Sequence, residues 1–131
     1  MQIQPTVLVV DANPTDRART VRLLEAAGYC VTETGSFDEA KHLITRAAPD
    51  VLITDLRLGS YNGLHLILRS KVDHPGMAAL VTSRFDDPVL QAEAERHHAA
   101  FVLRPIGDDE FLLAISDSLA AGRKAPTRPG L

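Results

Sequence analysis

Five short apolar runs alternate along the chain with segments in which apolar residues recur at helical spacing. Most of the runs are continuously apolar, which is typical of parallel strands covered on both faces. The pattern predicts strands at residues 7–10, 29–33, 51–54, 79–82 and 101–103. The intervening segments predict helices at residues 14–27, 37–47, 64–73, 88–98 and 108–121.

Residues that start and stop helices lie where this alternation requires them. Asn13 can cap the first helix with Pro14 at its first position, and Gly28 follows as a stop signal. Ser36 and Glu39 form a capping box for the second helix. A strict alternation of strand and helix implies right-handed crossovers. We therefore predict a flavodoxin-like α/β fold, a three-layer sandwich whose five-stranded parallel sheet has the order 2-1-3-4-5.

Length and composition indicate a single domain. The chain has 131 residues, 45% of them hydrophobic, which suits one compact core and leaves no room for a second. We predict that the domain covers residues 1–121. The segment GRKAPTRPGL that follows combines prolines, glycines and basic residues without an apolar face. Residues 122–131 are therefore expected to form a disordered tail or the start of a linker.

Charge and cysteine content narrow the classes of partner. The net charge is -3 and the basic residues are spread along the chain, which does not favour direct binding of nucleic acid. Cys30 is the only cysteine, so a disulfide framework is excluded and a buried, inert thiol is expected. The five histidines lack the spacing of metal ligands. The sequence shows neither a leader nor a membrane-spanning run, so we expect a cytoplasmic protein without membrane contact.

Polar residues follow four of the five predicted strands. Asp11 follows the first strand and Asp55 the third, Thr82 and Ser83 stand at the end of the fourth, and Arg104 follows the fifth. Because the carboxyl ends of parallel strands meet at one edge of a sheet, these side chains are expected to converge. Each has a structural explanation when taken alone, such as capping of the next helix by Thr82 or Ser83. Two carboxylates, two hydroxyls and a cation at one edge are better explained by chemistry.

Four segments carry a resemblance to a known family. VLVVDANPTDR, PDVLITDLRLGSYNGLHLI, ALVTSR and FVLRP resemble, in order and spacing, the motifs of the response regulator receiver domain. Gly63 lies eight positions after Asp55, where the family pattern places a glycine. The resemblance extends over nearly the whole chain, to about Ala121.

The resemblance implies a phosphorylation switch in two-component or phosphorelay signalling, and not an enzyme. Asp55 corresponds to the phosphoacceptor, whose carboxylate receives a phosphoryl group from a histidine kinase, a phosphotransfer protein or a small acyl phosphate. Mg²⁺ would lie between Asp55, Asp11 and the backbone carbonyl of Arg57. Such transfer depends mainly on positioning and on neutralisation of charge, so it requires few groups.

The resemblance also assigns the residues that would read the phosphorylated state. Thr82 corresponds to the switch hydroxyl, which hydrogen-bonds the phosphoryl group, and Phe101 to the switch aromatic, which rotates inward. Arg104 corresponds to the cation that pairs with the phosphoryl group, and the bond before Pro105 resembles one that the family holds in the cis form.

The sequence departs from the family pattern at the pocket itself. Receivers usually have two consecutive acids after the first strand, whereas here the second is Ala12. The resemblance makes this acid a direct ligand, so its loss is expected to lower the affinity for Mg²⁺ by at least about 10- to 100-fold, unless the amide oxygen of Asn13 compensates. Arg104 replaces the family lysine; its planar fork prefers bidentate partners and is able to pair permanently with Asp55. Smaller departures stand at Ser83, at His97 in place of a glycine, and at Gly59 in place of a proline.

Two other hypotheses about the function are compatible with the sequence. The chain is a phosphorylation-independent interaction module if the pocket no longer accepts phosphate; partners would then bind, as in receivers, at the face formed by residues 88–98, 101–103 and 108–121. VVDANPT also resembles the nucleophile motif of haloacid-dehalogenase-type phosphatases, with Asp11 as the nucleophile. That mechanism needs a second acid two positions later, and Asn13 cannot transfer the proton as a carboxyl group does.

Overall fold

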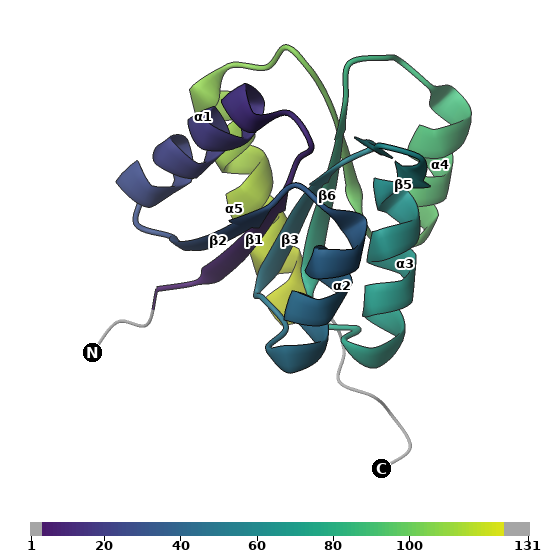
Figure 1. The fold of residues 1–131 in the computed structure, drawn as a ribbon, viewed down its shortest axis with the longest axis horizontal. Helices are drawn as coiled ribbons and strands as arrows, with labels where there is room; N and C mark the ends of the chain where they lie inside the picture. Colours follow the sequence, from purple (N-terminus) through teal and green to yellow (C-terminus); the bar gives the residue numbers. More distant parts are fainter. Residues whose placement is uncertain (1–3, 125–131) are drawn as a thin grey trace.

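The computed structural model describes residues 4–124 and contains one five-stranded parallel sheet (Figure 1). Its strands are β1 (Thr6–Val10), β2 (Cys30–Thr34), β3 (Val51–Asp55), β6 (Ala78–Ser83) and β7 (Ala100–Leu103). The helices are α1 (Pro14–Ala26), α2 (Phe37–Arg46), α3 (Gly63–Asp73), α4 (Pro88–Arg96) and α5 (Asp108–Lys124). The strands lie in the order β2-β1-β3-β6-β7, which confirms the predicted order 2-1-3-4-5, because β4 and β5 belong to a separate hairpin.

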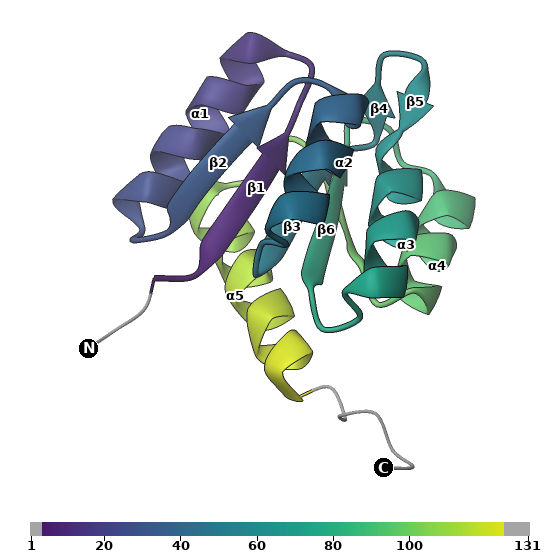
Figure 2. The same ribbon diagram turned by 60° about the horizontal axis from the view of Figure 1, so that its bottom comes forward.

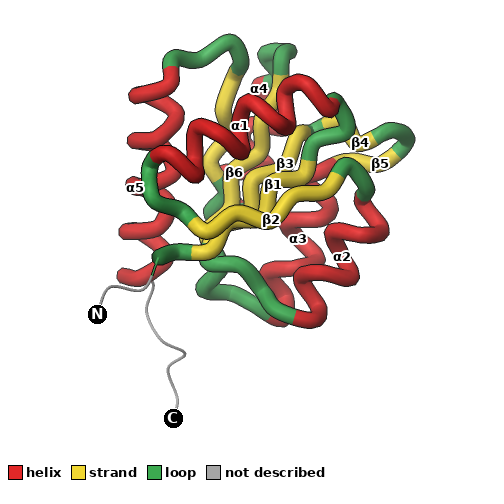
Figure 3. The backbone as a smooth tube through the Cα atoms, turned by 60° about the vertical axis from the view of Figure 1, so that its left-hand side comes forward, coloured by secondary structure: helices red, strands yellow, loops and turns green. Residues whose placement is uncertain are grey.

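Helices cover both faces of the sheet, as expected for a three-layer sandwich (Figure 3). Alternate residues of each strand point to opposite faces. Leu8 packs with Ile44 in a cluster formed with α2, α3 and α4, whereas Val9 packs with Leu24 in a cluster formed with α1 and α5. The continuous apolar runs in the sequence therefore reflect burial on both sides of the sheet.

The ends of the helices follow from local hydrogen bonds. Gly28 has a φ of 95° and ends α1, as predicted. The predicted end of the fourth helix at residue 98 is wrong, because α4 ends at Arg96. His98 has a φ of 60°, and the amide of Ala99 bonds back to the carbonyl of Ala94 at 2.9 Å. This is the usual left-handed closure of a helix, and it places His98, rather than His97, at the position that favours glycine.

The last helix is longer than the sequence pattern predicts. α5 continues to Lys124, so residues 122–124 form its last turn and do not begin the predicted tail. Gly122 lies beside the start of β6, where a Cβ would be 3.1 Å from the backbone oxygen of Gly76. Residues 125–131, the rest of the predicted tail, lie outside the described residues.

A short hairpin joins β3 to α3, where the sequence pattern predicts a loop. It consists of β4 (Arg57–Leu58) and β5 (Tyr61–Asn62), paired in the antiparallel direction. Gly59 in the turn has a φ of 63°, a conformation that proline cannot adopt. The hairpin closes at Gly63, whose amide donates to the carbonyl of Leu56 at 2.7 Å. A Cβ at Gly63 would overlap the backbone oxygen of Asp55, so the chain requires glycine there.

The exposure of Cys30 contradicts the expected buried thiol, because β2 is an edge strand and Cys30 is exposed. Among residues 4–124, none of the helices combines the length and the apolar composition that a membrane span needs.

Candidate functional site at the carboxyl edge of the sheet

The carboxyl ends of β1, β3 and β6 lie at the same edge of the sheet as the β4–β5 hairpin (Figure 2). A polar pocket of about 180 Å³ opens there. It brings together four of the residues predicted from the strand ends, Asp11, Asp55, Ser83 and Arg104. The other lining residues are Asn13, Asp16, Leu56, Arg57, Arg84 and Phe85.

Asp11 lines the pocket and is only 6% exposed. Its Oδ1 accepts a hydrogen bond from the amide of Asn13 at 2.9 Å, and its backbone oxygen accepts one from Nη1 of Arg17 at 2.7 Å. Burial is the main cause of a raised pKa at Asp11, which the Asn13 amide and the charge of Arg104 partly offset. A buried carboxylate of this kind favours a nearby cation.

In the structure the side chain of Asn13 caps helix α1. Its Oδ1 accepts hydrogen bonds from the amides of Thr15 at 2.9 Å and Asp16 at 3.0 Å, which caps α1. This confirms the predicted cap. The amide oxygen that would replace the acid missing at Ala12 is therefore already hydrogen-bonded in the helix cap, which argues against its use as a metal ligand.

Asp55 lies at the end of β3, half-buried, and faces Thr82 on the neighbouring strand. The hydroxyl of Thr82, which is 1% exposed, donates to Oδ1 of Asp55 at 3.3 Å. Burial is the first cause of a raised pKa at Asp55, and the charge of Asp11 is the second. The bond from Thr82 and the charge of Arg104 act in the opposite direction. The two carboxylates are thus close enough to repel each other.

Arg104 contributes its charge to the pocket without an ion pair to Asp55. The ion pairs among the described residues do not include Arg104. Its Nη2 donates a long hydrogen bond of 3.5 Å to Thr20, and its guanidinium lies over the ring of Phe111, 5.5 Å from the ring centroid. The permanent pairing with Asp55 that the sequence left open is therefore absent, and the peptide bond before Pro105 is cis.

Thr82 and Ser83 differ in role, although they stand side by side in the sequence. The hydroxyl of Ser83 donates to the carbonyl of Phe85 at 2.9 Å and accepts from the amide of the same residue at 3.0 Å. Ser83 therefore shapes the loop between β6 and α4. Neither hydroxyl caps α4, because Asp87 does so by accepting from the amide of Leu90.

Phe101 lies on β7, partly buried, and packs against the core cluster beside α4. The side chain is neither fully buried nor fully exposed. The rotation itself stays a prediction.

The sequence analysis did not predict Arg84 or Phe85 at the pocket, and it predicted only the backbone carbonyl of Arg57 there, not its side chain. Nη2 of Arg84 lies 2.7 Å from Oδ2 of Asp16 on α1, and the guanidinium of Arg57 lies 5.0 Å from the ring centroid of Phe85. The available signal was position, because Arg84 and Phe85 directly follow β6 and Arg57 follows β3 by two residues. The prediction considered mainly the residues at the end of each strand and not the loops that follow them.

The oxygen ligands of the pocket suit a hard divalent cation, although the pocket supplies fewer carboxylates than the three acids of the family pattern. Among residues 4–124, no cluster of three or more His, Cys, Asp or Glu side chains is suited to a metal ion. Asp11 and Asp55 nevertheless form a repelling pair of carboxylates, and Mg²⁺ is commonly held by one or two carboxylates together with phosphate oxygens and water. The residues therefore fit Mg²⁺ as a weak site completed by other ligands.

The comparisons with known proteins agree with this geometry. The model of the response regulator receiver domain matches residues 7–116. The alginate biosynthesis transcriptional regulatory protein AlgB of Pseudomonas putida is 30% identical over 118 residues, which is 88% of this chain and 26% of AlgB. The transcriptional regulatory protein GlrR of Escherichia coli is 27% identical over 114 residues, with 86% and 26% covered. The chain thus spans about a quarter of the length of these relatives.

Solved structures show the same fold. A CheY-like response regulator receiver domain protein from Methanospirillum hungatei superposes with a TM-score of 0.87 at 20% identity, and 95% of this chain and 100% of that one are covered. A response regulator receiver domain protein from Clostridium thermocellum has a TM-score of 0.84 at 23% identity, covering 91% and 97%.

Proposed function

The chain belongs to the response regulator receiver domain family, and on that premise we propose that it accepts a phosphoryl group on Asp55. Receiver domains are signalling modules of two-component systems that interact with histidine kinases or phosphotransfer proteins. The observation that carries the proposal is the pairing of Asp55 with the buried hydroxyl of Thr82 at the carboxyl edge of the sheet. We expect the protein to act in the cytoplasm, as a switch and not as an enzyme.

The chemistry proposed for Asp55 is an in-line transfer. A carboxylate oxygen of Asp55 forms a bond to phosphorus while the bond from phosphorus to the donor breaks. The electron pair of the broken bond leaves with the imidazole nitrogen of a phosphohistidine or with the carboxylate of an acyl phosphate. The pocket supports this step by positioning and by charge, since Arg104, Arg57 and Arg84 all line it.

We propose that Asp11, Asp55 and the backbone carbonyl of Arg57 hold Mg²⁺ in this pocket. When bound, the ion would neutralise charge on the transferred phosphoryl oxygens. Because Ala12 supplies no carboxylate and Asn13 is used as a helix cap, the affinity is expected to be low. The raised pKa values of Asp11 and Asp55 give the same pocket a preference for added positive charge.

Phosphorylation is proposed to change the surface formed by α4, β7 and α5. Thr82 would turn from the carboxylate of Asp55 to the phosphoryl group, and Phe101 would then become more deeply buried. This face carries three exposed apolar side chains, Val89 (77%), Leu103 (45%) and Leu113 (61%). We propose that these side chains contribute to a docking site for a downstream protein.

A second function follows if the pocket never receives a phosphoryl group. The same exposed face would then serve a phosphorylation-independent interaction module. The departure at Ala12 favours this alternative, because it removes a charge on which metal binding in the family depends. The retained contact between Thr82 and Asp55 favours phosphorylation.

The test of the main proposal is incubation with acetyl phosphate and Mg²⁺ followed by intact mass spectrometry. We expect a phosphoryl adduct in the wild type that is absent in Asp55→Ala and in the absence of Mg²⁺. If a competent histidine kinase also fails to phosphorylate the wild type, the protein is a phosphorylation-independent module.

A further inference from the structure

The guanidinium of Arg84 stands between the pocket and helix α1. Arg84 follows the last residue of β6, and its Nη2 lies 2.7 Å from Oδ2 of Asp16 on α1. It lines the pocket that contains Asp55 and also a neighbouring pocket of about 120 Å³ between α1 and α5. The side chain of Arg84 therefore lies beside the pocket of the phosphoacceptor Asp55 and is also paired with the carboxylate of Asp16.

We propose that Arg84 is a second phosphoryl-binding cation, which exchanges its ion pair with Asp16 for the oxygens of a phosphoryl group on Asp55. The inference rests on the function proposed above. A phosphoryl group brings more negative charge and more acceptor oxygens than the single carboxylate of Asp16. The planar fork of an arginine is suited to such an oxyanion, since it can donate two parallel hydrogen bonds.

The existing ion pair is weak enough to be exchanged. The side chain of Arg84 is 56% exposed and that of Asp16 is 20% exposed. Exposed ion pairs contribute little to stability because water and salt screen them. The next residue, Phe85, is 62% exposed, so this part of the loop is not held by core packing. A rotation of the long Arg84 side chain can therefore occur without disturbing the sheet.

Arg84 and Arg104 approach the acceptor from different elements. Arg104 enters from β7 and is in contact with Thr20 of α1 and Phe111 of α5. Arg84 enters from the loop after β6, the strand that also carries Thr82. Two cations on separate elements can surround an oxyanion more completely than either one alone.

The charges of the pocket support this assignment. Three acids, Asp11, Asp16 and Asp55, line it together with the arginines at positions 57, 84 and 104. The hydrogen bond with Asp16 is the first cause of a raised pKa at Arg84, and the charges of Asp55 and Asp11 add to it. Arg84 already lies in the field of the acceptor carboxylate. The three acids and the three arginines balance in formal charge, so a phosphoryl group on Asp55 would add negative charge with which the arginines can pair.

The proposed reaction is still the in-line transfer of a phosphoryl group to Asp55. With acetyl phosphate, the new bond joins an oxygen of Asp55 to phosphorus, and acetate leaves with the electron pair of the broken phosphorus–oxygen bond. Arg84 keeps its proton throughout and contributes only charge and hydrogen bonds to the phosphoryl oxygens.

The test compares rates of adduct formation with subsaturating acetyl phosphate and Mg²⁺, measured by intact mass spectrometry. Arg84→Ala should slow the reaction by about 3- to 10-fold, the loss expected of one partly exposed charge-assisted contact. Arg84→Lys should restore part of the rate. The matched control is Arg19→Ala, because Arg19 lines the neighbouring pocket but not that of Asp55.

A second variant tests the exchange itself. Asp16→Asn should raise the rate, since it releases Arg84, and this effect should vanish in the double variant with Arg84→Ala. Thermal unfolding checks that each variant is folded.

Three results would count against the inference. Equal rates in Arg84→Ala and Arg19→Ala would overturn the role of Arg84 and leave the proposed function intact. An Asp16→Asn effect that persists without Arg84 would overturn the exchange. Absence of any adduct in the wild type would overturn the proposed function, and this inference with it.

Discussion

The two edges of the same sheet contain similar residue types but differ in what those residues do. At the carboxyl edge, Asp11 and Asp55 line the same pocket, and burial together with the charge of Asp11 raises the pKa of Asp55. At the opposite edge, the carboxylate of Asp50 accepts from the backbone amide of Thr6 at 2.8 Å and from its hydroxyl at 3.3 Å. One edge holds two neighbouring acids with raised pKa values, and the other uses its acid to connect β1 and β3.

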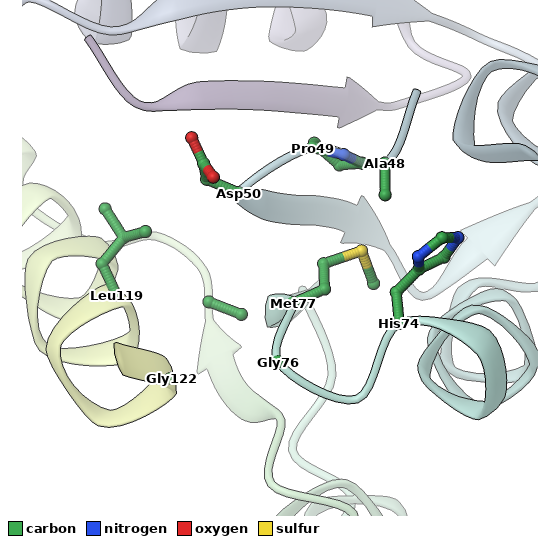
Figure 4. A pocket seen from close by; sticks show the side chains of 9 residues that line it. Ala48, Pro49, Asp50, His74, Gly76, Met77, Leu119 and Gly122 are labelled. Carbon is green, nitrogen blue, oxygen red and sulfur yellow. The ribbon is translucent and has the colours of Figure 1, made fainter. Parts of the chain in front are cut away.

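The opposite edge also has the roomier cavity. A pocket of about 320 Å³ lies beside Asp50, His74 and Met77 (Figure 4). Its single carboxylate is already bonded to Thr6, and the remaining lining is largely apolar or backbone. Cavity size therefore does not identify the functional site. What identifies it is a pair of neighbouring carboxylates, Asp11 and Asp55, whose pKa values are both raised, mainly by burial.

Exchanging one acid at each edge should give opposite results. Asp55→Asn is expected to abolish the phosphoryl adduct and raise the free energy of unfolding at neutral pH, because it removes a buried charge repelled by Asp11. Asp50→Asn is expected to leave the adduct unchanged and lower the free energy of unfolding by about 1 kcal/mol, because it weakens the bonds to Thr6. Mass spectrometry and urea unfolding measure the two effects. Loss of the adduct in Asp50→Asn would break the comparison.

Substitution of one glycine at each edge of the sheet should also have different effects on stability. Gly63→Ala is expected to lower the free energy of unfolding by about 1–3 kcal/mol and to slow phosphorylation, since the new methyl group displaces the backbone of Asp55. Gly76→Ala, at the other edge, adds a methyl group where nothing lies within 4 Å and should change stability by less than about 0.5 kcal/mol. Equal effects in urea unfolding would show that the hairpin closure at Gly63 does not hold the acceptor in place.

An added acid should create a stronger metal site at the carboxyl edge alone. Ala12→Asp is expected to raise the affinity for Mg²⁺ by about 10-fold, because a third carboxylate joins Asp11 and Asp55. Ala48→Asp, beside Asp50 in the other pocket, should give no comparable gain. Isothermal titration calorimetry measures both variants. No gain with Ala12→Asp would refute the explanation given for the missing acid.

The smallest expected effect is a change in the pH dependence of stability. The pKa of Asp11 is raised in the folded protein by burial, so its contribution to stability is present below pH 3.8 and is lost as the pH rises through the raised value. Asp11→Asn keeps the acceptor for the Asn13 amide and removes this loss. The variant should therefore gain stability relative to the wild type from about pH 4 upward. Urea unfolding at several pH values tests this, and a constant difference between the proteins would contradict it.

The sequence alone determined the architecture and the convergence of the strand ends. Strand order and layers follow from short apolar runs alternating with amphipathic segments, because both depend on local patterns of burial. Asp11, Asp55 and Arg104 were found because parallel strands must present their carboxyl ends at one edge. Caps such as Asn13 were found because the required bonds lie within three residues.

The tertiary structure decided which partner each polar side chain has. No local pattern indicates that Arg104 lies over the ring of Phe111 rather than beside Asp55. The pairing of Arg84 with Asp16 joins residues 68 positions apart, and a sequence pattern carries no information about such a pair. Long, flexible charged side chains choose among several neighbours by small differences in solvation and distance, and those differences exist only when the chain is folded.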